Sequence, residues 1–333
     1  MNTAMKLEPA TLRGVPLTCP RDGEVLTGTG TLRCTKCGSA YPVVNGVPVL
    51  IDDERSVFAI ADYSSPDAFR GASYGRADDR TIGIRRRVRR VARRVADVSS
   101  SLHYPSAEEA IAYVAALHER PRVLVIGSGG LRLGEDIAEV LNTDVAFADG
   151  VHAIADAHSL PFPDGRFDLV VAVAVLEHVA DPQRVVAEMT RVLAKDGHVY
   201  AVTPFLQPVH MGAYDFTRFT PIGHRRLFRA YDEVAAGPAL GVGSSLGLVL
   251  MATIGSAQSR LLRRLGRAFG LLVSATLRKL DRFLPDRGDA AAGCWFFGRK
   301  RDGAPISDRE LVQSYRDGFG RGPMQLPTPA IAP

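Results

Sequence analysis

Two long apolar runs constrain the fold of this chain more than any other feature. VLVIG at 123–127 and FDLVVAVAV at 167–175 consist almost entirely of aliphatic residues. Strands buried on both faces have this pattern, whereas a strand with one solvated face alternates apolar and polar residues. An amphipathic segment, DPQRVVAEMTRVLA at 181–194, follows the second run and is typical of a helix. The pattern predicts an α/β fold with a mostly parallel, doubly wound sheet.

Further elements are expected along the same region. Asp181 and Pro182 form an N-cap and first-turn pair that fixes where the predicted helix begins. GEDIAEVLN at 134–142 is expected to form a short helix, and GHVYAVTPF at 197–205 and CWFFGRK at 294–300 are expected to form strands. In such a sheet, ligands bind beyond the carboxyl ends of the strands.

The chain divides into segments of different composition. A cysteine-bearing module is expected at 1–54, an arginine-rich helical connector at 55–105 and the α/β domain at 106–300. A helical insertion at 237–285 precedes the last strand, and a flexible tail rich in proline and glycine is expected at 301–333. With 333 residues, the chain is long enough for one main domain and an accessory module.

The first apolar run leads into a glycine loop, Gly127-Ser128-Gly129. Glycines allow a sharp turn and close approach of backbone amides to a ligand. Arg132 stands where a dinucleotide-binding fingerprint has a small residue, which disfavours an NAD site. The loop therefore predicts a nucleotide-type pocket of another kind.

Residues 155–205 closely resemble the class I S-adenosylmethionine-dependent methyltransferases, and the resemblance extends over about residues 120–300. It implies a Rossmann-like fold and the cofactor S-adenosyl-L-methionine. In that family the aspartate matching Asp156, with the backbone of Ala157, contacts the adenine. The acid ending the second strand, best matched by Asp149, would bind the ribose hydroxyls, because a carboxylate can accept two hydrogen bonds. The cofactor-binding residues expected in full are Gly127, Ser128, Gly129, Asp149, Asp156, Ala157 and Glu177.

Two departures from the family pattern stand out. Val125 occupies the position where related pockets usually carry an acid, and a charge-assisted hydrogen bond of that kind contributes about 1.5–3 kcal/mol. The eight residues DGVHAIAD at 149–156 are too few for a helical crossover between parallel strands.

The acceptor side is expected in the segment TPFLQPVHMGAYDFTRF at 203–219. It resembles a methyltransferase subgroup with a Pro-Phe-Leu-Gln-Pro run followed by a histidine. His210 is the candidate general base, because imidazole titrates near neutral pH. Asp215 would orient it or act as a base itself, or instead form a structural ion pair with Arg218. His178 is a candidate for lining the acceptor pocket.

The N-terminal module contains three of the four cysteines of the chain, in two knuckles that each end in glycine. It resembles short zinc-ribbon domains fused to methyltransferases. Cys19, Cys34 and Cys37 with Asp22 make a feasible Zn²⁺ site of structural type, and loss of the metal is the alternative. Asn45-Gly46 between two valine-rich strands is a strong hairpin signal.

One arginine-rich stretch and one apolar stretch of the sequence indicate which partners the chain could bind. IRRRVRRVARRVADV at 84–98 places valines at helical spacing among arginines, which suits packing on the main domain or contact with an anionic membrane. No charged residue occurs from 234 to 259, and a basic amphipathic pattern follows, so peripheral membrane contact is a second expectation. Nucleic acid is disfavoured as a partner, because no basic groove interleaved with aromatic residues is apparent. Low cysteine usage and the absence of a signal-peptide pattern predict a cytoplasmic protein.

The sequence therefore predicts an S-adenosylmethionine-dependent methyltransferase acting on an oxygen of a small-molecule, lipid-linked or glycan acceptor. The alternative is a non-catalytic scaffold with the same fold, which binds a partner through the ribbon and the basic helix.

Overall fold

A computed structural model describes residues 8–65, 104–256, 288–317 and 326–329, with a few isolated residues between 257 and 287. The arginine-rich helix expected at 84–98 and most of the basic segment expected after 259 lie outside these residues.

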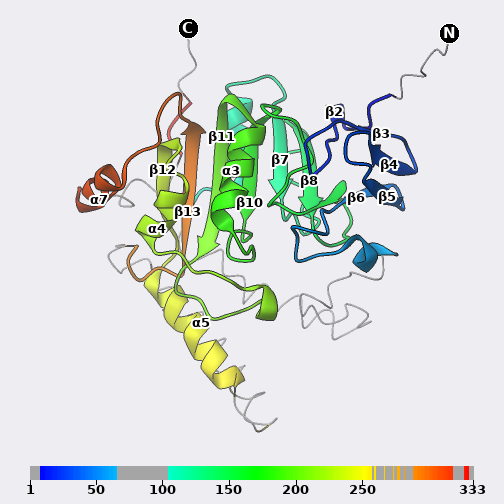
Figure 1. The fold of residues 1–333 in the computed structure, drawn as a ribbon. Coiled ribbons are helices and arrows are strands. Elements are labelled where there is room, and N and C mark those ends of the chain that lie inside the picture. Colours follow the sequence, from blue (N-terminus) through cyan, green and yellow to red (C-terminus); the bar gives the residue numbers. More distant parts are fainter. Residues whose placement is uncertain are drawn as a thin grey trace, which may run out of the picture.

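An eleven-stranded sheet forms the centre of the molecule, in the order β12-β13-β11-β10-β7-β8-β9-β6-β5-β4-β3 (Figure 1). Its middle strands are parallel: β7 (Arg122–Ile126), β8 (Glu139–Asp144), β9 (Ala153–Ala155), β10 (Phe167–Val173) and β11 (Leu193–Pro204). β13 (Gly293–Lys300) runs antiparallel to both β11 and β12 (Tyr231–Leu240). The predicted Rossmann-like α/β architecture is therefore observed.

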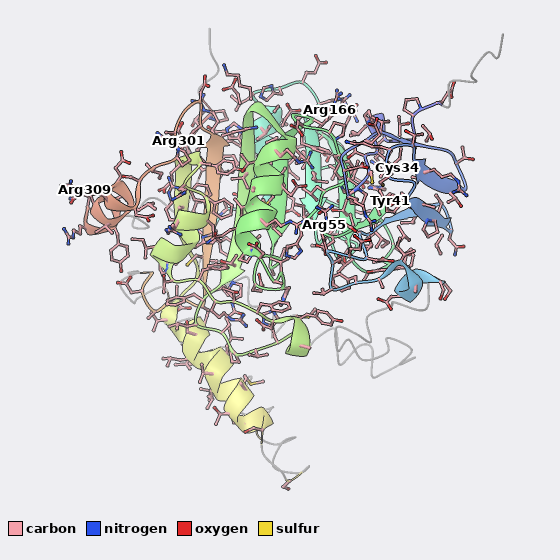
Figure 2. The ribbon with its side chains drawn as sticks, in the orientation of Figure 1. Cys34, Tyr41, Arg55, Arg166, Arg301 and Arg309 are labelled. Atoms are coloured by element: carbon pink, nitrogen blue, oxygen red, sulfur yellow. The ribbon has the colours of Figure 1, made fainter. Side chains whose placement is uncertain are left out.

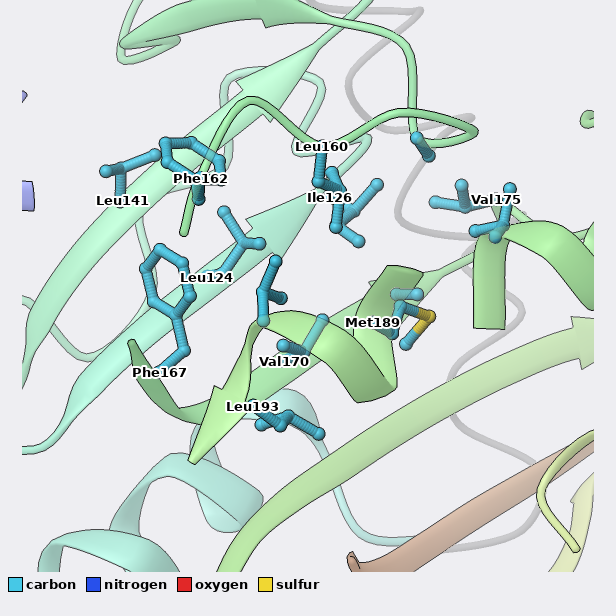
Figure 3. Packing of buried hydrophobic residues seen from close by; sticks show 14 of the residues in the cluster. Leu124, Ile126, Leu141, Leu160, Phe162, Phe167, Val170, Val175, Met189 and Leu193 are labelled. Carbon is cyan, nitrogen blue, oxygen red and sulfur yellow. The ribbon is translucent and has the colours of Figure 1, made fainter. Parts of the chain in front are cut away.

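Helices cover both faces of the sheet because alternate strand residues point to opposite sides. Leu124 and Ile126 of β7 belong to the same buried cluster as Met189 of α3 (Pro182–Val192) (Figure 3). Val123 and Val125 face the other way and pack with α2 (Ala107–Ala115). Each continuous apolar strand thus contributes side chains to two hydrophobic cores, one on each face of the sheet.

The helix α3 begins where the sequence predicts. The Asp181 side chain accepts a hydrogen bond from the Arg184 amide, and Pro182 occupies the first turn. The helix expected at 134–142 is a wrong prediction, because Glu139–Asp144 forms β8 instead. Residues 140–143 are all buried between β7 and β9, so tertiary packing decides their conformation.

The cysteine module is built from short strands and joins the main sheet. β5 (Ala40–Val44) and β6 (Val47–Leu50) form the predicted hairpin, with Asn45 at φ 49° and Gly46 at φ 80° in its turn. β6 also pairs in parallel with β9, so the hairpin continues the sheet. The remaining strands of the module are β1 (Thr11–Leu12), β2 (Val15–Pro16), β3 (Leu26–Thr27) and β4 (Thr31–Cys34).

The other elements lie around the ends of the sheet. They are η1 (Ile60–Tyr63), η3 (Gly212–Tyr214), α4 (Pro221–Leu227), α5 (Val242–Gly255) and α7 (Asp308–Arg316). The insertion expected from 237 begins only after β12 ends at Leu240, and α5 extends away from the sheet (Figure 1). α7 lies within the segment expected to be a flexible tail, and its Leu311 is buried. Among the described residues, no helix combines the length and apolar character needed to cross a bilayer.

Candidate active site

The carboxyl ends of β7, β8, β9, β10 and β11 share one edge of the sheet, because these strands are parallel. The glycine loop follows β7, Asp156 follows β9, Glu177 follows β10 and His210 follows β11. The topology therefore brings the expected cofactor and acceptor residues to the same edge.

The glycine loop packs directly against the chain that leaves β10. Gly127 has φ +61°, and a Cβ at this position would lie 2.6 Å from Val175 Cγ2. Ser128 is buried, and its hydroxyl has no hydrogen-bond partner in the described part of the chain. A tight backbone cradle with an unpartnered hydroxyl fits an adenosyl ligand. Val125 lies inside β7, packed in the cluster under α2, so it offers no polar contact there.

Asp144, rather than Asp149, ends the second parallel strand. Its Oδ2 accepts a hydrogen bond from the Gly129 amide at 2.7 Å, and its Oδ1 accepts one from the Ala146 amide at 2.9 Å. Asp149 lies five positions later in an exposed turn. The expected strand-end position of Asp149 is thus wrong. The error follows from the missed strand β8, and the carboxylate oriented at the glycine loop is that of Asp144.

Asp156 is buried and already has partners on both carboxylate oxygens. Oδ1 accepts a hydrogen bond from the His158 amide and lies 2.6 Å from His158 Nδ1, while Oδ2 accepts one from the Ser56 hydroxyl. Burial alone would raise its pKa, but the hydrogen bonds from His158 and Ser56 hold it below its usual value. Ala157 is buried next to it. Sequence patterns gave no sign of the contact with Ser56, because the two residues lie 100 positions apart.

The segment 56–63, which follows the cysteine module, contacts this edge of the sheet at three points. Besides the Ser56 contact, the Phe58 ring stacks on Tyr214 at 5.7 Å between centroids. The Tyr63 hydroxyl donates a hydrogen bond to the Val145 carbonyl at 2.7 Å. The segment therefore links the loops after β8, β9 and β11.

Glu177, His178 and His210 converge at the acceptor side. The Nε2 atoms of His178 and His210 are 3.1 Å apart, and they lie 3.6 Å and 4.0 Å from Glu177 Oε1. Glu177 is completely buried, and burial raises its pKa to about 7. Burial also lowers the pKa of His178. Glu177 was expected to bind the cofactor, but the structure groups it with the two acceptor-side histidines.

Asp215 and Arg218 form a bidentate ion pair that holds the loop after β11. Arg218 also donates hydrogen bonds to the carbonyls of Gln207 and Pro208, and Asp215 accepts one from the His210 amide at 2.9 Å. Burial opposes ionisation of Asp215, but the Arg218 guanidinium lowers its pKa to about 2. The pair therefore fixes the position of His210.

Ala174 is a feature of the site that sequence reasoning missed. It has φ 54°, in the left-handed region that residues other than glycine rarely occupy. It directly follows β10, three residues before Glu177. Backbone strain of this kind concentrates at functional sites.

A second group of potential ligands lies in the cysteine module, in the region of Cys34 and Tyr41 (Figure 2). Cys19 Sγ lies 3.7 Å from Cys37 Sγ, and Cys34 Sγ lies 3.4 Å and 3.5 Å from the oxygens of Asp22. Ligands at tetrahedral Zn²⁺ are separated by about 3.8 Å for two sulfurs and about 3.5 Å for a sulfur and an oxygen, given the usual bond lengths. The four side chains fit a zinc ion.

Comparisons with known proteins bear on the family of the α/β domain. Residues 135–201 match the family described as "Methyltransferase domain". A phosphatidylethanolamine N-methyltransferase of Cereibacter sphaeroides is 50% identical over 91 residues, which cover 26% of this chain and 44% of that protein.

Two other relatives act on different atoms, to judge by their names. A ubiquinone/menaquinone biosynthesis C-methyltransferase of Psychromonas ingrahamii is 38% identical over 68 residues, covering 20% of this chain and 27% of that protein. A malonyl-[acyl-carrier protein] O-methyltransferase of Geobacter sulfurreducens is 35% identical over 98 residues, covering 24% and 37%. The chain thus spans less than half the length of these relatives. The family match and the relatives support a class I S-adenosylmethionine-dependent methyltransferase domain in this chain.

Proposed function

We propose that the chain is an S-adenosylmethionine-dependent methyltransferase that methylates an oxygen of a small-molecule, lipid-linked or glycan acceptor. The observation that carries the proposal is the contact between the two halves of the site. Val175 packs under Gly127 of the glycine loop, and Glu177 and His178 lie two and three positions after it in the chain. A cofactor cradled by the loop therefore lies next to the acceptor-side cluster.

The cofactor side uses backbone amides and one carboxylate. S-adenosylmethionine, when bound, supplies an activated methyl group. Gly127, Ser128 and Gly129 would approach it through the backbone, and Asp144 would accept hydrogen bonds from the ribose hydroxyls. This assignment replaces Asp149, which is exposed. Asp156 and Ala157 remain the proposed adenine contacts, because a carboxylate has about four lone-pair sites and can add a further partner.

The acceptor side supplies orientation and a proton acceptor. In the metal-free chain, His210 Nε2 is the proposed general base for an acceptor hydroxyl, with Asp215 placing its loop and His178 lining the pocket. A hydroxyl needs such a base because it must lose a proton as the methyl group is transferred. This cluster favours oxygen as the acceptor atom.

The cysteine module is proposed to bind a structural zinc ion through Cys19, Asp22, Cys34 and Cys37. The Cys19–Cys37 and Cys34–Asp22 separations support this, because both match tetrahedral coordination and all four ligand atoms lie within 4.8 Å of one another. Peripheral membrane contact is proposed for α5, whose Leu246 and Val249 are exposed.

A non-catalytic scaffold is the second candidate function. Two observations favour it: Val125 removes the usual acid, and Ser56 already occupies an oxygen of Asp156. A scaffold would bind a partner and would not need the cofactor.

Calorimetric titration of the full chain with S-adenosylmethionine distinguishes the two candidates. We expect binding to the wild type, and a dissociation constant about 10–100-fold higher for Asp144→Asn, because a charge-assisted hydrogen bond contributes about 1.5–3 kcal/mol. Asp149→Asn is the matched control and should bind like the wild type. Absence of binding at millimolar ligand would exclude the enzyme and leave the scaffold.

A further inference from the structure

We propose that Glu177, His178 and His210 form a binding site for a first-row divalent transition-metal ion, separate from the cysteine site. One carboxylate oxygen and two imidazole nitrogens lie within 4.8 Å of one another, on the chain after β10 and the loop after β11. Two histidines and a carboxylate are a recurrent ligand set for Zn²⁺ and Fe²⁺.

The unpartnered carboxylate of Glu177 is the first argument for an ion. Its side chain is fully buried, yet neither oxygen accepts a hydrogen bond from any other residue that the structure describes. Asp156 and Asp215, whose side chains are also buried, each have partners on both oxygens. A buried carboxylate without partners is costly, and coordination to a cation would compensate it.

The second argument is the orientation of the two imidazoles. His178 Nδ1 lies 2.8 Å from the Tyr214 carbonyl oxygen, so this nitrogen carries the proton and Nε2 has a free lone pair. His210 Nδ1 lies 3.4 Å from Asp215 Oδ2. Metal-bound histidines almost always donate their second nitrogen to a carbonyl or a carboxylate in this way.

His210 has one alternative tautomer. Its Nδ1 is also 3.4 Å from Arg218 Nη2, and a proton on Nε2 could then be donated to His178. That arrangement would satisfy both rings but would leave Glu177 unpartnered. An ion accounts for all three side chains at once.

The spacing suits a transition metal with small adjustments. With metal–nitrogen and metal–oxygen bonds of about 2.0–2.2 Å, tetrahedral ligand atoms lie about 3.3–3.5 Å apart. The observed separations of 3.1, 3.6 and 4.0 Å bracket this value. Imidazole donors favour Zn²⁺, Fe²⁺ or Co²⁺ over Mg²⁺, which prefers oxygen ligands.

Three protein ligands leave a coordination position for another molecule. Resting on the proposed methyl transfer, we infer that an acceptor hydroxyl occupies it. The ion would lower the pKa of that hydroxyl, so that its proton passes to solvent water as the oxygen accepts the methyl group, and His210 would then act as a ligand instead of a base.

The test is a titration of the chelator-treated full chain with Co²⁺ in the absence of S-adenosylmethionine. Co²⁺ at the cysteine site gives a thiolate charge-transfer band in the near ultraviolet, whereas the proposed site has no sulfur ligand. We expect Glu177→Gln and His210→Ala to bind one Co²⁺ fewer per chain than the wild type, with the thiolate band unchanged. That unchanged band also shows that the cysteine module, whose β6 pairs with β9 of the main sheet, is folded in the variants, and an unchanged circular dichroism spectrum shows the same for the rest of the chain. His118→Gln, an exposed histidine just before β7, is the matched control and should bind like the wild type.

The number of Co²⁺ ions that depend on Glu177 decides the result. If the cysteine site fails to bind, the wild type should still take up one ion without the thiolate band, which supports the proposal. Equal Co²⁺ binding by the wild type and both variants would overturn it. Because cofactor binding is measured separately, failure of the metal site and failure of the proposed methyltransferase remain distinguishable.

Discussion

Replacing Gly127 by alanine tests whether the glycine loop is held by its contact with Val175. At φ +61°, a residue with a Cβ costs about 1–2 kcal/mol. The new Cβ would lie 2.6 Å from Val175 Cγ2, and overpacking of this kind costs about 1–3 kcal/mol. We expect Gly127→Ala to lower the free energy of unfolding by about 2–5 kcal/mol. Gly165→Ala, at φ +66° with no atom within 4 Å, should cost only the backbone share.

A double-mutant cycle with Val175→Ala isolates the steric part. Without its two γ-carbons, the nearest remaining side-chain atom at position 175 is Cβ, which lies 3.7 Å from the Cβ added at position 127, an ordinary contact distance. Adding Gly127→Ala to this variant should cost only about 1–2 kcal/mol, which gives a coupling of about 1–3 kcal/mol. Urea unfolding followed by circular dichroism measures all four free energies. The reasoning is refuted if Gly127→Ala costs no more than Gly165→Ala, or costs the same with and without Val175.

Three further outcomes are expected. Burial lowers the pKa of His224 from 6.5 to about 3, so its contribution to stability is complete above pH 6.5 and is lost as the pH falls towards 3. Between pH 7.5 and 5 this loss is about 2 kcal/mol, and urea unfolding at both values should show that His224→Gln lacks it. If the cysteine site holds zinc at 100 times its dissociation constant, removing the metal with a chelator should lower the free energy of unfolding by about 3 kcal/mol. The chelator should not change the free energy of unfolding of Cys37→Ser. An equal effect on the wild type and this variant would argue against the site. Arg191→Met removes charge-assisted hydrogen bonds to the Leu160 and Phe162 carbonyls, at a cost of about 3 kcal/mol measured by thermal unfolding, and an unchanged melting temperature would contradict this.

The parts of the fold with a strong burial pattern could be predicted from the sequence. Strands β7, β10, β11 and β13 each contain a run of buried, mostly apolar residues, because both faces of the sheet are covered along that run. The start of α3 was fixed by its cap, Asp181. β8 could not be recognised, because its central residue Asn142 is polar. The Asn142 side chain is buried, and its amide donates hydrogen bonds to the Leu131 and Gly150 carbonyls, which a local pattern does not reveal.

Several residues of the candidate site were named from the sequence, but neither Asp144 nor the arrangement of the site was predicted. His178 and His210 were expected on the acceptor side, yet their approach depends on the loop that Asp215 and Arg218 hold in place. The position of Asp144 depended on finding β8. The contact of Ser56 with Asp156 follows from the pairing of β6 with β9, which brings two distant segments together. Long-range pairing of this kind has no local signal.

The two margins of the eleven-stranded sheet offer poor templates for the addition of a foreign strand. At one end β3 has only two residues, Leu26 and Thr27. At the other end β12 contains Asp232, Glu233 and Pro238, and its register against β13 is twice irregular. Short edges, charges, proline and bulges all oppose edge-to-edge association. The sheet can therefore remain open at both ends, because neither edge strand readily pairs with a strand of another molecule.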